Sequence, residues 1–179
     1  GMTKELAYSI MDDKQQAMFE KDLELDLAIG MDDMGSFRIN VFQQRGEVAL
    51  VVWHVSPTMP TITALGLPSN LNQLIMETSG LILVVGATGS GKSTTLASMI
   101  DYRSKQKSGH ILTIEDPIEY IHHHHKSIVN QREVGVDTHS FANALRRAMR
   151  EAPDVIMVGE ILDRETMQQA LTYAETGHL

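Results

Sequence analysis

The chain has 179 residues, 42% of them hydrophobic and 21% charged, which is ordinary globular composition with room for one domain or two small ones. It contains no cysteine, which excludes disulfides and thiolate metal sites within the chain, and no apolar run approaches the ~20 residues of a membrane helix. Its net charge of −8 disfavours nucleic acid as the main partner, because an acidic protein repels phosphate backbones at long range. We therefore expect a cytosolic protein that does not bind nucleic acid.

The beginning of the chain is predicted to form a small antiparallel α+β module over residues 1–56. Asp12 and Asp13 precede a short capped helix at 14–21. Apolar residues then alternate with polar or small ones at 23–29, 37–41 and 47–55, which is the period of a half-buried strand. Asp32, Asp33 and Gly35 indicate a turn, and the short turns between the strands favour an antiparallel sheet.

Residues 57–68 are predicted to be an extended linker, because they include three prolines, which lack the amide donor and fix φ. The remainder, 69–179, is predicted to be an α/β module. Buried strands are expected at 81–85, 111–114 and 155–158 with a short one at 128–130, and helices at 69–78 with Ser69 as its cap, from Lys92, at 141–150 and at 164–176.

The order of these elements predicts the fold class of the second module. Strands that alternate with helices imply a mostly parallel sheet covered on both faces. Neither module looks complete from its pattern, and the second stops at Leu179, where another strand is expected.

The strongest motif is a glycine-rich phosphate loop between an apolar run and a predicted helix. It matches G-x-x-x-x-G-K-[ST] in full and reads Gly86, Ala87, Thr88, Gly89, Ser90, Gly91, Lys92, Ser93. The glycines let successive backbone amides face one anion, and the following helix adds its positive N-terminal dipole. Lys92 supplies charge to the β- and γ-phosphates, and Ser93 offers a hydroxyl to Mg²⁺. The alternative is a chance glycine turn, which this context disfavours.

Two acidic groups follow predicted strands. Glu115, Asp116 and Glu119 come after 111–114, and Glu160 comes after 155–158. Ligands bind beyond the carboxyl ends of parallel strands, so both groups face the expected site. Glu160 has the form of a Walker B acid, whereas spacing alone does not choose a catalytic base within the first group.

At this point the sequence resembles the secretion ATPase superfamily and, within it, the type IV pilus retraction ATPases of the PilT and PilU type. The resemblance covers most of the chain and rests on four blocks in family order: the phosphate loop extended to Thr94 (86–94), TIEDPIEY at 113–120, APDVIMVGE at 152–160 and AETGHL at 174–179. The retraction branch is indicated by QREVG at 131–135 and by Glu175. YIH at 120–122, APD at 152–154 and RETM at 164–167 favour PilU.

The resemblance implies a fold and a set of roles. The fold is a RecA-like P-loop ATPase core, truncated at its C-terminal side and preceded by a partial PAS-like domain. By similarity, Glu119 is the general base, Glu160 orders the Mg²⁺ site together with Ser93, Lys92 belongs to the catalytic set, and His178 senses the nucleotide. The implied cofactors are ATP and Mg²⁺.

The resemblance also implies a setting. Such proteins form homo-hexamers with ATP at subunit interfaces and power pilus retraction, hence twitching motility, at the cytoplasmic face of the inner membrane. The implied partners are another retraction ATPase and the inner-membrane platform protein of the pilus. For this 179-residue chain alone, we expect nucleotide binding with weak hydrolysis and no stable hexamer.

Two departures from the family pattern support an alternative function. Trp53 and Leu162 stand where the family usually has arginine, and neither can donate a charge-assisted bond to phosphate. The alternative is an ATP-binding ring subunit with little hydrolysis of its own that assists a partner ATPase. A small-molecule kinase is disfavoured, because no acceptor pocket or lid is evident. The histidine run at 122–125 favours a polar edge or loop over a metal site.

Overall fold

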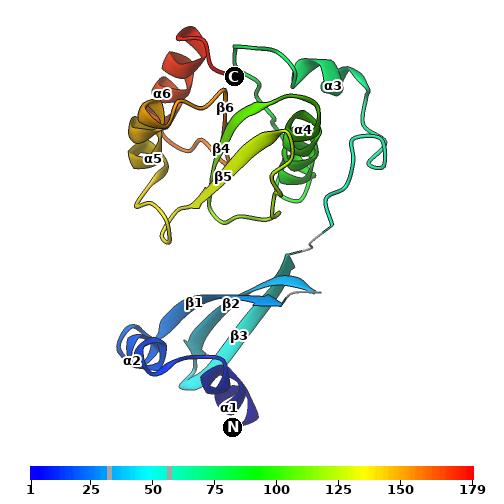
Figure 1. Cartoon of the computed structure of the whole chain (residues 1–179). Helices are drawn as coiled ribbons and strands as arrows, with labels where there is room; N and C mark the ends of the chain where they lie inside the picture. The colour runs from blue at the N-terminus through cyan, green and yellow to red at the C-terminus, as the bar shows by residue number, and fades with distance from the viewer. Residues whose placement is uncertain (32–33, 56–57) are drawn as a thin grey trace. The chain divides into compact units, whose positions relative to one another are not determined.

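The structure is a computed structural model that describes residues 1–31, 34–55 and 58–179. The chain forms two compact units, Gly1–Pro57 and Thr58–Leu179, each described by itself below (Figure 1). The predicted turn at Asp32 and Asp33, and residues 56 and 57 at the predicted start of the linker, lie outside the described residues.

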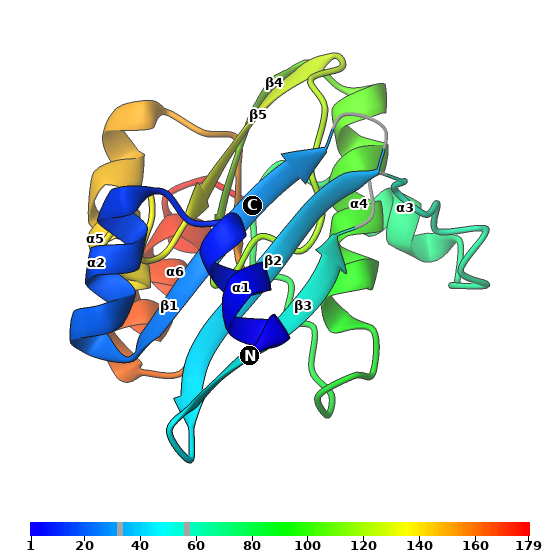
Figure 2. The ribbon, with the colours of Figure 1, turned by 90° about the horizontal axis from the view of Figure 1, so that it is seen from below.

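The first unit is an antiparallel sheet with two helices. Its elements are α1 (Met2–Ser9), α2 (Asp13–Asp22), β1 (Glu24–Met31), β2 (Gly35–Gln44) and β3 (Glu47–Val55), and the strands pair in the order β1-β2-β3. Both helices lie on the same face of the sheet, as Figure 2 shows. The period-two pattern therefore predicted the strands and their antiparallel pairing correctly.

Local chemistry explains where α2 begins and what it buries. The Asp12 side chain accepts a hydrogen bond from the Gln15 amide at 2.7 Å, and the Gln15 side chain accepts one from the Asp12 amide at 2.9 Å. This capping box satisfies two amides that a helix start otherwise leaves unpaired. The core between the helices and the sheet consists of Ala7, Met11, Phe19, Leu27, Ile39 and Val41.

The second unit is a three-layered α/β structure. It contains α3 (Asn70–Leu74), α4 (Lys92–Gln106), β4 (Gly109–Glu115), β5 (Ser127–Glu133), α5 (Phe141–Ala148), a 3₁₀ turn (Met149–Glu151), β6 (Val155–Val158) and α6 (Arg164–Glu175). The strands are parallel in the order β5-β4-β6, with α4 on one face and α5 and α6 on the other (Figure 1). The predicted mostly parallel sheet is confirmed.

Alternate residues of β4 build the two cores of this unit. Ile111 packs with Met99 and Ile100 of α4 on one face. On the other face, Leu112 and Ile114 pack against α5 and α6. Because both faces are covered, β4 is buried along most of its length, as parallel strands are.

Three local predictions differ from the structure. Residues 81–85 form no strand: Leu83 is 55% and Val85 88% exposed, and the segment makes no ladder with β4, β5 or β6. The helix predicted at 69–78 is the shorter α3, and Ser69 makes no side-chain capping bond. In the stretch expected to be a linker, Ile62 is only 3% exposed and joins the core of the second unit.

Candidate nucleotide-binding and catalytic site

The phosphate loop, residues 86–93, has the backbone that an anion cradle requires. Gly89 and Gly91 have φ of 78° and 90°, in the left-handed region that favours glycine. A Cβ on Gly86 would lie 2.6 Å from Ser90 Oγ, so any larger residue would displace that side chain. Helix α4 begins at Lys92 with Gly91 as its N-cap and no side chain on the first-turn amides, which leaves them available to an anion.

Polar side chains at the start of α4 connect this loop to a second one. Lys92 Nζ donates to the carbonyl oxygens of Gly86 and Ala87, both at 3.0 Å. Ser93 Oγ donates to Glu119 Oε1 at 3.0 Å. The hydroxyls of Thr94 and Tyr120 lie 3.0 Å apart in a hydrogen bond. The structure therefore brings the phosphate loop against residues 116–122, here called the acidic loop.

The candidate bases in and before the acidic loop have different surroundings. Glu115, at the end of β4, is only 9% exposed, whereas Glu119 is exposed and hydrogen-bonded to Ser93. Burial raises the pKa of the Glu115 carboxyl, and hydrogen bonds from Thr113 and Gln131 act in the opposite direction. Of these two carboxylates, it is Glu119 that lies at the phosphate loop.

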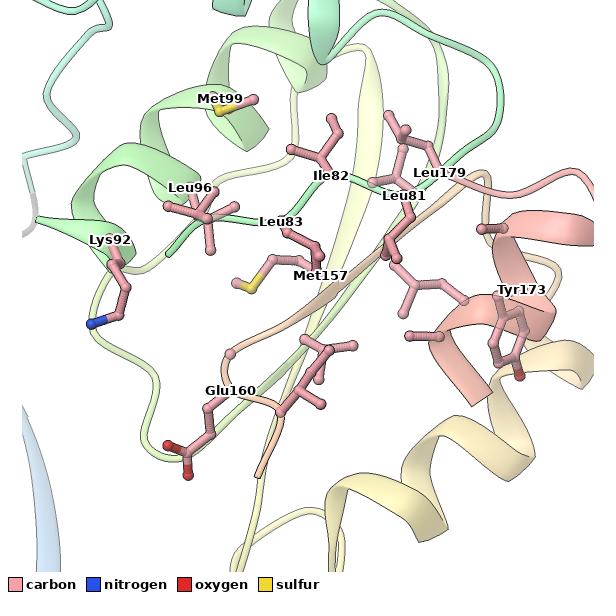
Figure 3. A pocket seen from close by; sticks show the side chains of 18 of the residues that line it. Leu81, Ile82, Leu83, Lys92, Leu96, Met99, Met157, Glu160, Tyr173 and Leu179 are labelled. Carbon is pink, nitrogen blue, oxygen red and sulfur yellow. The ribbon is translucent and has the colours of Figure 1, made fainter. Parts of the chain in front are cut away.

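Glu160 reaches the site from the end of β6. The preceding Gly159 donates its amide to Ile114 O at 2.8 Å, and a Cβ there would lie 3.3 Å from that oxygen and from the Cα of Glu115. This close backbone contact fixes the point at which the chain leaves the sheet. Lys92 and Glu160 lie at the same side of a cavity of about 510 Å³, with their charged ends turned away from its apolar interior (Figure 3).

Most of that cavity is not suited to phosphate. Its walls are largely apolar and come from residues 81–85, β6 and α6, with Leu83 and Met157 among the side chains inside (Figure 3). Only the end near Gly86, Lys92 and Glu160 carries the groups that the sequence predicted for a nucleotide site.

The structure does not bring His178 to these groups. Its ring packs edge-on against Tyr173 at 5.3 Å between centroids, and its Nδ1 lies 3.3 Å from Thr176 Oγ1. Its carbonyl accepts from the Gly80 amide at 2.9 Å, six residues before the phosphate loop begins. Within this chain, His178 therefore lies at the opposite end of the 81–85 segment from the cradle.

Metal binding can be judged from the donors present. Ser93 offers a hydroxyl oxygen, and Glu119 and Glu160 offer carboxylate oxygens, which is the ligand chemistry that Mg²⁺ prefers. No cluster of three His, Cys, Asp or Glu suited to a metal occurs in the described part of the chain. In the histidine run, the His122 side chain is 8% exposed. Its burial is the main reason why its pKa is lowered to about 4.

The chain matches a known protein family. A family model described as type II/IV secretion system protein matches residues 15–179. The chain belongs to this family. Among the described residues of this secretion-family chain, no helix is both long and apolar enough to span a membrane.

Individual relatives of this secretion-family chain include two type IV pilus ATPases. It is 49% identical over 177 residues to the type IV pilus ATPase PilU of Pseudomonas aeruginosa, covering 99% of the chain and 46% of the relative. It is also 49% identical over 174 residues to the pilus ATPase PilT of that organism, covering 97% and 51%. A crystal structure of the pilus retraction motor PilT with bound ADP matches with a TM-score of 0.93 and 56% identity, over 98% of the chain and 51% of that structure.

These matches confirm the resemblance to pilus retraction ATPases and the predicted fold class. The chain spans about half the length of the curated relatives that it matches. Sequence reasoning missed one polar side chain at the site, Gln131, which hydrogen-bonds to the acidic loop. The signal was present, because Gln131 opens the 131–135 block, but spacing gave no indication of where its amide points.

Proposed function

We propose that the chain is the nucleotide-binding part of a motor subunit that hydrolyses ATP to power type IV pilus retraction and hence twitching motility. The observation that carries the proposal is the 3.0 Å hydrogen bond between Ser93 and Glu119, because it joins a phosphate cradle to a carboxylate from another strand end. Family membership and the PilU and PilT relatives support it. By this proposal, residues 86–94 bind the nucleotide.

Each group of the site has its own role in the proposed reaction. The amides of the phosphate loop and Lys92 bind and orient the phosphates, and Ser93 and Glu160 hold Mg²⁺, which supplies charge neutralisation at the phosphates when it is bound. Glu119 orients the attacking water and accepts its proton. We also propose that His178 senses the nucleotide. Since it contacts Tyr173 and Thr176 here, that role requires a signal relayed through the 80–86 segment.

The proposal includes the oligomeric state, the location and the partners of the protein. We infer a homo-hexameric ring located in the cytoplasm at the inner-membrane face, with another retraction ATPase and the pilus platform protein as partners. The support is the similarity to the PilU and PilT proteins of the pilus system.

Removing single carboxylates tests the assignment. In the full-length protein, Glu119→Gln and Glu160→Gln keep the side-chain shape, so ATP binding should persist while turnover falls by about 100-fold or more, because the first removes the general base and the second removes a carboxylate of the Mg²⁺ site. Phosphate release and titration with a fluorescent ATP analogue measure the two effects. Glu77→Gln, at an exposed position, is the matched control. Loss of turnover in Glu115→Gln with full turnover in Glu119→Gln would overturn the choice of base.

A ring subunit with little hydrolysis of its own is the second candidate. It is favoured by the two non-arginine side chains, since Leu162 is 80% and Trp53 55% exposed and neither can pair with phosphate. Steady-state phosphate release by the full-length protein, measured with and without a partner retraction ATPase, separates the two functions. A phosphate-release rate that stays at background for the protein alone, and that adds nothing to the partner's own rate, favours the second function.

A further inference from the structure

Side chains of strand β5 hold the backbone of the acidic loop. Glu133 Oε2 accepts from the Ile118 amide at 3.1 Å. Gln131 makes two bonds from one amide group: its Nε2 donates to Tyr120 O at 2.9 Å, and its Oε1 accepts from the His122 amide at 2.7 Å. Gln131 thus binds the loop on the C-terminal side of Glu119.

Gln131 is itself held in place. Its Nε2 also donates to Glu115 Oε1 at 3.1 Å, and the same oxygen accepts from Thr113 Oγ1 at 2.6 Å. Thr113 is fully buried and Glu115 nearly so, so this pair offers Gln131 a fixed partner. With Glu133 bound to the Ile118 amide and Gln131 bound to the Tyr120 carbonyl, side chains of β5 hold the acidic loop on both sides of Glu119.

This arrangement matters because Glu119 is exposed and, among the described residues, its side chain hydrogen-bonds only to Ser93. An exposed loop residue without a fixed backbone would sample many positions, and a misplacement of about 1 Å can cost about 100-fold in rate. We propose that Gln131 is a positioning residue for the catalytic step: its amide fixes the acidic loop so that the Glu119 carboxylate stays at the phosphate loop. This inference rests on the proposed ATPase function.

The strand pairing does not involve this side-chain amide. Gln131 joins the β4–β5 ladder through its backbone, in register with Thr113. The neighbouring Asn130 carries the same amide group on the same strand, but bonds to His110 Nε2 at 2.9 Å, away from the acidic loop. The two residues are therefore a matched pair that differ in whether they touch the loop.

The test compares Gln131→Leu with Asn130→Leu in the full-length protein. Gln131→Leu should lower kcat about 10- to 100-fold while the affinity for ATP, measured with a fluorescent analogue, changes by less than about 2-fold. Hydrogen exchange should become faster in a peptide covering 116–122 and stay unchanged in α4. Asn130→Leu should change neither quantity. Unchanged turnover in Gln131→Leu, or parallel loss of affinity and of protection in α4, would overturn the inference.

A second variant covers the case in which Gln131→Leu does not fold. Thr113→Val keeps the buried shape and removes the hydroxyl that orients Glu115, so the same pattern is expected with a kcat loss of about 3- to 10-fold. An unchanged kcat in this variant contradicts the network. Failure of the proposed function would give a different result, namely equal phosphate release by wild type and Glu119→Gln. Faster exchange at 116–122 in Gln131→Leu would still report the loop contact in that case.

Discussion

The phosphate loop and the acidic loop are joined by hydrogen bonds from Ser93 to Glu119 and between Thr94 and Tyr120, yet they obtain their shapes in different ways. The phosphate loop is shaped by its own residues, with left-handed Gly89 and Gly91 and with Lys92 folded back onto two loop carbonyls. The acidic loop is shaped by side chains from elsewhere in the chain, chiefly Gln131 and Glu133.

This difference predicts which substitutions should affect nucleotide binding and which should affect turnover. A loop defined by local backbone geometry resists distant substitutions, so nucleotide binding should depend mainly on residues 86–94. A loop defined by distant side chains can lose its position while the rest of the fold stays intact. Binding and turnover should therefore separate by location.

Acid should weaken the packing of the acidic loop around His122. Burial holds the pKa of His122 at about 4, below its usual 6.5, so the folded state binds this proton less readily than the unfolded state. Its contribution to stability is complete above about pH 6.5 and is lost as the pH falls toward about 4, by at most about 3 kcal/mol.

Urea unfolding of wild type and His122→Gln at about pH 7 and about pH 5 measures this loss. The variant should show a smaller drop, since it cannot titrate at that position. His139→Gln, which alters an exposed histidine that does not act on His122, should behave like wild type. Equal drops in all three proteins would show that His122 does not control the acid response.

Gly159 tests the non-local packing beside the acidic loop. Its replacement by alanine places a Cβ 3.3 Å from backbone atoms of Ile114 and Glu115, which cannot easily move, and should cost about 1–3 kcal/mol of unfolding free energy. Gly30→Ala in β1 is the matched control, because a Cβ there meets no atom within 4 Å. Denaturant melts that show equal effects for the two variants would contradict the close contact.

The smallest effect concerns helix starts outside both loops. Ser140 Oγ accepts from the Asn143 amide at 3.1 Å and caps α5, so Ser140→Ala should cost about 1 kcal/mol. Ser69 stands at the equivalent position of α3 without such a bond, so Ser69→Ala should be close to neutral. Thermal melts compare the two, and a larger loss for Ser69→Ala would show that α3 is capped after all.

The sequence predicted the elements that are determined by their own residues. Period-two alternation predicted β1 to β3, and Asp12 predicted the start of α2. The apolar run 81–85 predicted burial in a sheet, but the presence of a pairing partner depends on distant parts of the fold. Helix α1 was missed, since Ala7 is its one buried residue and an amphipathic pattern is weak.

At the site, too, the sequence predicted the features that depend on local residues and missed those that depend on distant packing. The motif predicted the loop and helix start at Lys92, because glycine conformations follow from glycine positions. Spacing could not separate Glu115 from Glu119, since burial decides between them and depends on the packing of β4. The contacts of Gln131 join residues 9 to 16 positions apart, which no local pattern encodes.

Lys92 gives the most direct test of the nucleotide site itself. Lys92→Ala removes a charged donor from the phosphate loop, a contact of about 1.5–3 kcal/mol, so affinity for a fluorescent ATP analogue should fall about ten-fold or more. Lys107→Ala, beyond the end of α4, should bind like wild type. Tight binding by wild type with this loss in Lys92→Ala is the result we predict. Unchanged affinity in Lys92→Ala would contradict the assignment of residues 86–93 as the phosphate cradle.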